Sequence, residues 1–255
     1  MSDNRIIAVH SYKGGTGKST VAVNLADMLA REGRTLLLEA NYLNPILFSL
    51  GSFSTTTDKN FNALLTENVL LYDILQRSWQ DNLAVVTSYP IQSPLEDPFL
   101  TRGRQYALSF QQSISQQINE LLNPRYAGED AFAYMVIDLP PGVHPLNAIL
   151  LSTAQMVCVV TRPHIGVTVS NTWRIYSLLR LFKKIIVWNQ LPEDISVIER
   201  IENTIKKKYN LDDFSPSVMI PYQNDYVLEA SIGNLINLTI QDHLLPVLKT
   251  FFHKT

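Results

Sequence analysis

Short apolar runs alternate along the chain with segments whose apolar residues recur at helical spacing. The runs are rich in β-branched residues and apolar on both faces, as strands buried in a parallel sheet are. We predict strands over residues 6–9, 35–39, 83–87, 134–138, 156–161, 185–189 and 218–220. This alternation predicts an α/β fold with a doubly wound, mostly parallel sheet flanked by helices.

Helical spacing between the strands is clearest in two segments. These are Val169, Trp173, Tyr176 and Leu179, then Ile195, Ile198, Ile201 and Ile205. Polar or proline-bearing residues fill 51–60 and 88–103, where we expect long surface loops. The chain has no internal repeat and no long linker, so we expect residues 1–255 to form a single domain.

The composition fits a folded domain. The chain has 255 residues, 46% hydrophobic and 17% charged, which is enough for a substantial core. Its net charge of −2 gives no overall attraction to nucleic acid or anionic lipid. The single cysteine, Cys158, lies in an apolar run and is expected to be buried rather than reactive. We see no signal peptide and no apolar run near the roughly 20 residues that span a membrane, so we expect a cytoplasmic protein.

A glycine-rich octamer follows the first predicted strand and precedes a helical pattern. Its residues are Lys13, Gly14, Gly15, Thr16, Gly17, Lys18, Ser19 and Thr20. In a phosphate-binding loop, backbone N–H groups and the N-terminus of the next helix surround phosphate oxygens. Lys18 is placed to reach the β- and γ-phosphates, and the Ser19 hydroxyl to hold Mg²⁺. The octamer therefore predicts a bound nucleoside triphosphate with Mg²⁺; the alternative is an ordinary tight turn.

A second chemical element ends the strand predicted over 134–138. Asp138 closes this apolar run, and Pro140, Pro141 and Gly142 follow. A carboxylate at the carboxyl end of a parallel strand lies at the same sheet edge as the phosphate loop and can hold Mg²⁺ through water. An aspartate after an apolar strand is common, so the prediction depends on its pairing with the octamer.

The octamer departs from the general phosphate-loop pattern. Tyr12 stands where glycine is usual, and a second lysine, Lys13, precedes Gly14. This arrangement resembles the deviant loop of the ParA/MinD family of P-loop ATPases. In that family the first lysine reaches the phosphates of the partner subunit, so the resemblance implies a catalytic role in trans for Lys13, beside Lys18, and a homodimer bridged by ATP. The alternative is a solvated loop lysine.

The resemblance extends through nearly the whole chain. The Asp138 element resembles the family's strand that ends in an aspartate near the metal. Asn189 resembles the asparagine that hydrogen-bonds adenine, whose edge suits an amide; the alternative is a cap at a strand end. Pro221 lies in a stretch similar to the family's late segment near the base. The resemblance thus implies ATP, with Asn189 and Pro221 beside its base.

The chain differs from the family after the second strand. The family carries two acids there, one that helps hold the metal shell and one that positions the attacking water. This chain has Glu39 and then Asn41. An amide orients water but cannot accept its proton. We therefore expect Ser19, Glu39 and Asp138 around the metal, and slow hydrolysis because Asn41 occupies the catalytic position.

Three kinds of target fit such a switch. An apolar stripe near the C-terminus suits a membrane surface, but the last packed helix of the domain explains it better: Leu244, Leu248, Phe251 and Phe252. The lysines at 206–208 suit non-specific DNA binding but also a solvated helix end. The third target is an activator or cargo protein that contacts nucleotide-dependent loops.

Together these features predict a slowly hydrolysing ATPase that forms ATP-bridged dimers and positions or partitions a cargo. The alternative is a non-catalytic ATP-binding regulatory module, because Asn41 replaces the usual acid. The stretch from Asn44 to Leu47 also resembles bacterial tyrosine kinases, which share this fold. Their C-terminal tyrosine cluster is missing from this sequence, so we favour the ATPase.

Overall fold

The computed structural model describes residues 5–47, 59–66, 69–162, 183–191, 196, 199–200, 203–204, 207, 217–222 and 236–252. Within these residues, eight strands form one sheet in the order β3-β4-β2-β5-β1-β6-β7-β8. The strands are β1 (Ile6–His10), β2 (Thr35–Glu39), β3 (Gln76–Arg77), β4 (Leu83–Val86), β5 (Tyr134–Asp138), β6 (Met156–Thr161), β7 (Lys183–Leu191) and β8 (Ser217–Pro221). All neighbouring pairs are parallel except β3 with β4. The predicted fold class is confirmed.

The predicted strands match those observed with small differences in length. Strands β2, β5 and β6 have the predicted bounds, β1, β7 and β8 are longer, and β4 is one residue shorter. Strand β3 was not predicted, because two residues at a sheet edge leave no periodic pattern in the sequence. The helices predicted from residues 169–179 and 195–205 lie, apart from a few isolated residues of the second, outside the described part of the chain.

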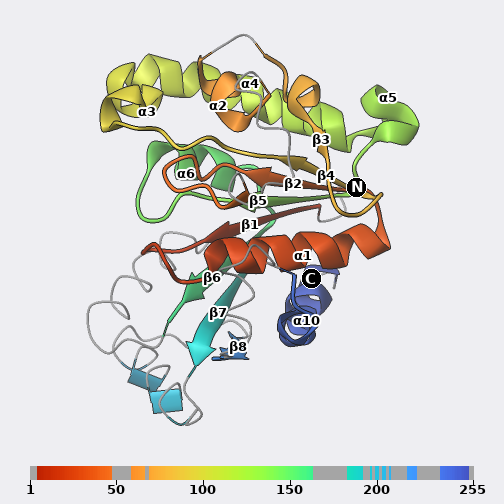
Figure 1. The fold of residues 1–255 in the computed structure, drawn as a ribbon, viewed down its shortest axis with the longest axis vertical. Helices are drawn as coiled ribbons and strands as arrows, with labels where there is room; N and C mark the ends of the chain where they lie inside the picture. The colour runs from red at the N-terminus through yellow and green to blue at the C-terminus, as the bar shows by residue number, and fades with distance from the viewer. Residues whose placement is uncertain are drawn as a thin grey trace.

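Helices cover both faces of the sheet (Figure 1). One face carries α1 (Lys18–Glu32) and α10 (Leu238–Phe252); the other carries α2 (Phe61–Thr66), α4 (Gly103–Leu122) and α6 (Pro145–Leu151). The remaining helical segments are short: α3 (Pro98–Thr101), α5 (Pro124–Ala127), and the 3₁₀ turns η2 (Leu71–Ile74), η3 (Pro94–Glu96) and η4 (Gly128–Asp130).

Side chains that alternate along each strand build two separate cores. In β1, Ile7 and Val9 pack with α1, whereas Ile6 and Ala8 pack on the side of α4 and α6. Cys158 lies in the core on the α1 side and is fully buried, as predicted, and burial raises the pKa of its thiol to about 12. The α1 side is therefore an apolar layer that packs the first helix against one face of the sheet.

The C-terminal stripe faces the core. Leu244, Leu248 and Phe251 are buried in the α1-side core, while Phe252 is 45% exposed. This confirms that the stripe belongs to a packed helix of the domain. Among the described residues, no helix is both long enough and apolar enough to cross a membrane. Of the basic run at 206–208, the structure describes Lys207 alone, which is exposed.

The surface loop predicted over 88–103 is confirmed only in part, since much of the segment is exposed but some of it is folded against the domain. This segment contains η3 and α3, and its residues Ser88, Asp97 and Phe99 are buried. Asp97 begins α3 by accepting a hydrogen bond from the Phe99 amide, and the Phe99 ring packs edge-on against Phe110. A capping aspartate and an aromatic anchor thus fold this stretch against the domain despite its prolines. Of the loop predicted over 51–60, only the last two residues are described.

Candidate functional site

The glycine-rich loop joins β1 to α1 at the carboxyl edge of the sheet, beside the point where the strand order reverses direction. In open α/β sheets this edge is where ligands bind. Gly15 and Gly17 have φ angles of 71° and 84°, a left-handed conformation that favours glycine. A Cβ at Gly17 would lie 2.0 Å from Asn189 Nδ2, whereas one at Gly14 would meet no described atom within 4 Å. The loop is therefore tightly packed beneath Gly17 and open above Gly14.

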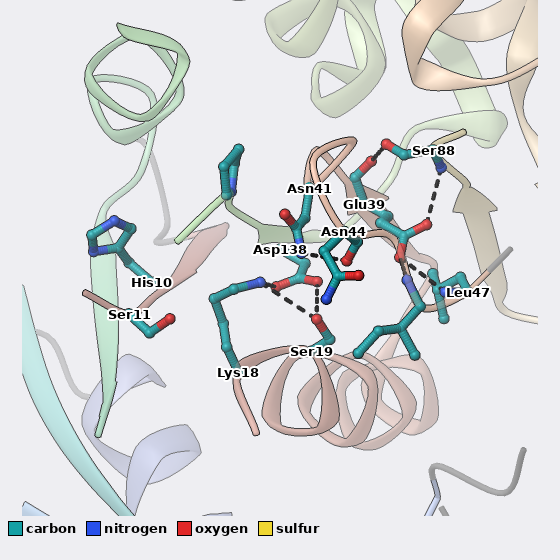
Figure 2. A network of polar contacts seen from close by, with 12 residues as sticks. His10, Ser11, Lys18, Ser19, Glu39, Asn41, Asn44, Leu47, Ser88 and Asp138 are labelled. Carbon is teal, nitrogen blue, oxygen red and sulfur yellow. Dashed lines mark hydrogen bonds and ion pairs between the residues drawn. The ribbon is translucent and has the colours of Figure 1, made fainter. Parts of the chain in front are cut away.

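Three predicted site residues meet at the start of α1 (Figure 2). Lys18 Nζ forms an ion pair with Asp138 Oδ1, and Ser19 Oγ donates a hydrogen bond to Asp138 Oδ2 at 2.5 Å. All three side chains are buried, with residue exposures of 5%, 4% and 2%. The convergence follows from the fold, because β1 and β5 are parallel neighbours whose carboxyl ends lie at one edge. A lysine, a hydroxyl and a carboxylate thus share one small polar site.

Two buried polar atoms, one in the phosphate loop and one in the loop after β2, have no hydrogen-bond partner among the described residues. They are Thr16 Oγ1 and Asn41 Oδ1. The Asn41 amide group is oriented by its nitrogen, which donates to the Asn44 carbonyl at 2.8 Å. A buried polar atom without a partner is costly in a folded protein. These two oxygens are therefore available to a ligand or to ordered water.

Glu39 lies beside Asp138 in the sheet but points elsewhere. Its register partner is Asp138, yet Figure 2 shows its carboxylate directed toward Leu47 and Ser88. Oε1 accepts hydrogen bonds from the amides of Ile46 and Leu47 at 2.6 and 2.9 Å, and Oε2 accepts one from the Ser88 amide at 3.0 Å. In this arrangement Glu39 organises the loop after β2, and its predicted role beside the metal stays a prediction.

The pKa of Glu39 reflects these surroundings. Complete burial raises it to about 7, and the nearby charge of Asp138 acts in the same direction. The three backbone N–H donors oppose this shift, because they favour the ionised form. Burial outweighs the hydrogen bonds, so Glu39 changes charge near neutral pH.

The loop after Asp138 is held by residues outside the octamer. The Gly142 amide donates to the Ser11 carbonyl at 2.8 Å, and His10 Nε2 lies 2.9 Å from the Gly142 carbonyl. Asn147 Nδ2 donates to the carbonyls of Gly142 and Pro140, at 2.9 and 3.1 Å. Burial lowers the pKa of His10 to about 4, assisted by the charge of Lys18. His10 is therefore neutral in the folded protein at neutral pH.

The residues predicted to contact the base lie on the other side of the loop. Asn189, at 6% exposure, donates from Nδ2 to the Thr16 carbonyl at 2.8 Å, so it is tied to the phosphate loop. Pro221 ends β8 and is exposed. Their contact with adenine stays a prediction.

The remaining members of the octamer occupy its surface. Thr20 is half-buried in the first turn of α1, where its carbonyl accepts a hydrogen bond from Asn24. Lys13 is exposed, and no ion pair joins it to another described residue. The two lysines of the loop thus differ sharply, since Lys18 is buried against Asp138 and Lys13 faces solvent.

The donor set suits a magnesium nucleotide. Ser19 and Asp138 place a hydroxyl and a carboxylate oxygen side by side, and oxygen is the ligand that Mg²⁺ prefers. Mg²⁺ usually takes few protein ligands and completes its shell with phosphate and water. This agrees with the described residues, which contain no group of three or more His, Cys, Asp or Glu able to hold a metal ion.

Sequence reasoning missed several residues that shape the site: His10, Asn44, Ser88 and Asn147. His10 ends a strand, and Ser88 directly follows a predicted one. Because the carboxyl ends of parallel strands share one edge, both positions could have been singled out as neighbours of the loop. Asn44 and Asn147 left no comparable signal.

Comparison with known proteins agrees with this geometry. A family model described as an AAA domain, AAA_31, matches residues 4–191. The chloroplastic Fe-S cluster assembly factor HCF101 of Oryza sativa subsp. japonica is 33% identical over 183 residues, covering 70% of this chain and 30% of that protein. The iron-sulfur cluster carrier protein of Escherichia coli (strain K12) is 29% identical over 203 residues, covering 78% of this chain and 46% of that protein. The chain thus spans less than half the length of either relative.

Solved structures show the same fold over almost the full chain. A putative plasmid partition protein from Borrelia burgdorferi B31, bound to AMPPNP, aligns with a TM-score of 0.68 at 19% identity and covers 97% of this chain and 98% of that one. The septum site-determining protein MinD of Pyrococcus horikoshii OT3, complexed with Mg-ADP, aligns with a TM-score of 0.66 at 17% identity and covers 97% and 93%. The family match over residues 4–191 shows that the chain belongs to the AAA_31 family of AAA domains, and these likenesses show that it has the fold of ParA/MinD-type P-loop ATPases.

Proposed function

We propose that this protein is an ATP-binding, slowly hydrolysing dimerisation switch that positions or partitions a cargo. The observation that carries the proposal is the convergence of Lys18, Ser19 and Asp138 at the N-terminus of α1. A buried lysine, a hydroxyl and a carboxylate at a helix N-terminus are the groups that hold a nucleoside triphosphate with its magnesium ion. Structural neighbours that bind AMPPNP or Mg-ADP support a nucleotide ligand.

Different residues of the site are proposed to contact the phosphates and the magnesium ion. The open backbone at Gly14 and Gly15 faces the phosphates, and Lys18 exchanges its ion pair with Asp138 for phosphate oxygens. Ser19 and Asp138 would hold Mg²⁺, which neutralises charge on the β- and γ-phosphates when bound. The Thr16 hydroxyl, free among the described residues, supplies one further donor at the loop.

The exposed position of Lys13 is the observation that favours the proposed dimer. Its side chain is exposed at the loop and makes no ion pair with another described residue, so nothing seen in the subunit uses its charge. A cation directly beside a phosphate site can contribute to phosphoryl transfer by stabilising charge on the transferred group. We propose that Lys13 does this on the nucleotide of a second subunit, which requires ATP to hold two copies face to face.

Asn41 supports slow turnover. Its Oδ1 is a buried acceptor without a described partner, and Nδ2 is committed to the Asn44 carbonyl. The free oxygen can accept a hydrogen bond from an attacking water and so orient it, but an amide cannot take the proton. Phosphoryl transfer depends mainly on positioning and charge stabilisation, so hydrolysis is slowed rather than abolished. The same observation favours the second candidate, a regulatory module that binds ATP without hydrolysing it.

We do not extend iron–sulfur carriage to this chain. Iron–sulfur clusters are held mainly by cysteine thiolates, and this sequence has one cysteine. Cys158 is fully buried in β6, and burial raises its pKa to about 12, which keeps it a neutral thiol.

Light scattering on a sizing column tests the proposal, with Mg²⁺ and ATP, ADP or no nucleotide, and with the eluted nucleotide identified. The proposal predicts a dimer with ATP that still contains uncleaved ATP. Lys13→Ala should remove the dimer while ATP binding by the monomer persists, because Lys13 is exposed and takes no part in the ion pair within the subunit. An oligomeric state indifferent to nucleotide, with ATP bound, would instead select the regulatory module.

Asn41→Asp tests the hydrolysis step. An added carboxylate can accept the proton from water, and a positioned general base contributes about 10²–10⁴-fold. We expect phosphate release in single-turnover assays to accelerate by at least tenfold. An unchanged rate would show that Asn41 does not limit hydrolysis.

A further inference from the structure

A buried carboxylate outside the nucleotide site joins three segments of the fold. Asp97 is 1% exposed, and its Oδ1 accepts hydrogen bonds from the Tyr42 hydroxyl at 3.1 Å and the Phe99 amide at 2.9 Å. Its Oδ2 lies 2.8 Å from His144 Nε2. An ionised carboxylate can accept three hydrogen bonds on its two oxygens. A neutral amide cannot, because it has a single oxygen.

The hydrogen bonds define the protonation of the neighbours. The Leu146 amide donates to His144 Nδ1 at 3.1 Å and thereby caps α6, so Nδ1 carries no proton. His144 therefore donates from Nε2 to Asp97. Burial and the Asp97 charge raise the pKa of Tyr42, which keeps its hydroxyl a donor. The imidazole ring also stands edge-on to Tyr42, with ring centroids 6.0 Å apart.

The two side chains that contact Asp97, Tyr42 and His144, each belong to a loop of the nucleotide site. Tyr42 directly follows Asn41, in the loop whose far end is held by the contacts of Ile46 and Leu47 with Glu39. His144 ends the loop that starts after Asp138 and that binds the Ser11 carbonyl through the Gly142 amide. Tyr42 lies 55 residues before Asp97, and His144 lies 47 residues after it. The Asp97 carboxylate thus connects the two loops.

We propose that Tyr42, Asp97 and His144 form a positioning cluster that makes the loop after β2 and the loop after β5 move as one unit. Asn41, proposed above to orient the attacking water, and the segment after Asp138 are thereby held in a fixed relation. The consequence for hydrolysis rests on the proposed function, whereas the coupling itself is a property of the folded chain and can be measured without nucleotide.

Amide hydrogen exchange on the nucleotide-free protein tests the coupling with two conservative variants. Tyr42→Phe removes one donor to Asp97 without changing ring volume. His144→Asn keeps an oxygen able to cap α6 but is too short to reach Asp97. If the cluster couples the loops, each variant should accelerate amide exchange in the loop that does not contain the substitution. Tyr42→Phe should accelerate exchange of the Gly142 amide, and His144→Asn should accelerate exchange of the Ile46 and Leu47 amides. Loss of one hydrogen bond should accelerate the exchange of these amides about fivefold.

Tyr106→Phe is the matched control. It removes a tyrosine hydroxyl that donates to the Leu65 carbonyl at 2.7 Å, on a ring packed against Phe99, and this hydrogen bond reaches neither loop. It should lower the melting temperature about as much as Tyr42→Phe and leave all three reporter amides unchanged. If each cluster variant changes exchange only in its own loop, Asp97 is a local cap and the proposal is wrong.

A second arm separates this proposal from the proposed function. With ATP and Mg²⁺, both loops of the wild-type protein should become protected from amide exchange. In each cluster variant, only the loop after β5 should become protected. The same variants should lower kcat with KM within about twofold, as expected when an interaction acts on the transition state rather than on binding. Absence of any ATP protection at residues 13–20 would refute nucleotide binding, while the exchange data without nucleotide would still decide the coupling.

Discussion

Gly17→Ala is a direct test of how tightly the phosphate loop is built. Alanine at a φ of 84° adopts the left-handed conformation, which costs about 1–2 kcal/mol. Its Cβ would stand 2.0 Å from Asn189 Nδ2, so the amide must move away and lose its 2.8 Å hydrogen bond to the Thr16 carbonyl. That hydrogen bond contributes about 1 kcal/mol. We therefore expect Gly17→Ala to lower the free energy of unfolding by about 2–3 kcal/mol.

Urea denaturation of a double-mutant cycle separates the two contributions. Asn189→Ala removes the clashing group, so Gly17→Ala in that background should cost only the backbone part, and the two substitutions should be non-additive by about 1 kcal/mol. Gly14→Ala is the control, because its Cβ meets no described atom within 4 Å and its φ is not positive. It should change the free energy of unfolding by less than about 0.5 kcal/mol. Additivity of Gly17→Ala with Asn189→Ala would refute the steric argument.

Two buried groups predict opposite responses of stability to pH. His10, whose pKa burial lowers from 6.5 to about 4, stays neutral when folded, so the stability it allows is present above pH 6.5 and is lost as the pH falls toward 4. His10→Gln should remove about 2 kcal/mol of this loss between pH 7.5 and 5, measured by urea denaturation. Glu39, whose pKa burial raises from 4.5 to about 7, favours the folded state at low pH, and stability falls as the pH rises through 7. Glu39→Gln should flatten this fall by about 2–3 kcal/mol between pH 5 and 8, and equal pH profiles for variant and wild type would contradict either assignment.

The parts of the fold that the sequence predicts are those encoded locally. Apolar runs identify the buried strands, and the parallel order that follows from strand–helix alternation puts the ends of β1 and β5 together. That is why Lys18 and Ser19 could be expected from the amino-acid sequence alone to share one site with Asp138, about 120 residues further along the chain.

The parts that could not be predicted depend on side-chain contacts between distant segments. Nothing near Asp97 in the sequence indicates that it faces Tyr42 and His144 rather than solvent. The direction of Glu39 is similar: its position at the end of β2 predicts a place beside the metal, but the extra methylene lets the carboxylate reach the amides of the next loop and of Ser88. Register identifies the neighbours of a residue, whereas rotamer choice depends on donors that only the folded chain brings near.

The register of Glu39 with Asp138 also explains what an acid at position 41 would meet. Two buried carboxylates already stand on adjacent strands, and the charge of Asp138 raises the pKa of Glu39. An aspartate at 41 adds a third, and it replaces the amide that donates to the Asn44 carbonyl at 2.8 Å with an oxygen that repels it. Asn41→Asp should therefore turn over faster and yet melt at a lower temperature without nucleotide, and Mg²⁺ with ATP should restore the difference because bound cations offset clustered negative charge. If the melting temperature is unchanged without nucleotide, position 41 does not share the electrostatic environment of Glu39 and Asp138.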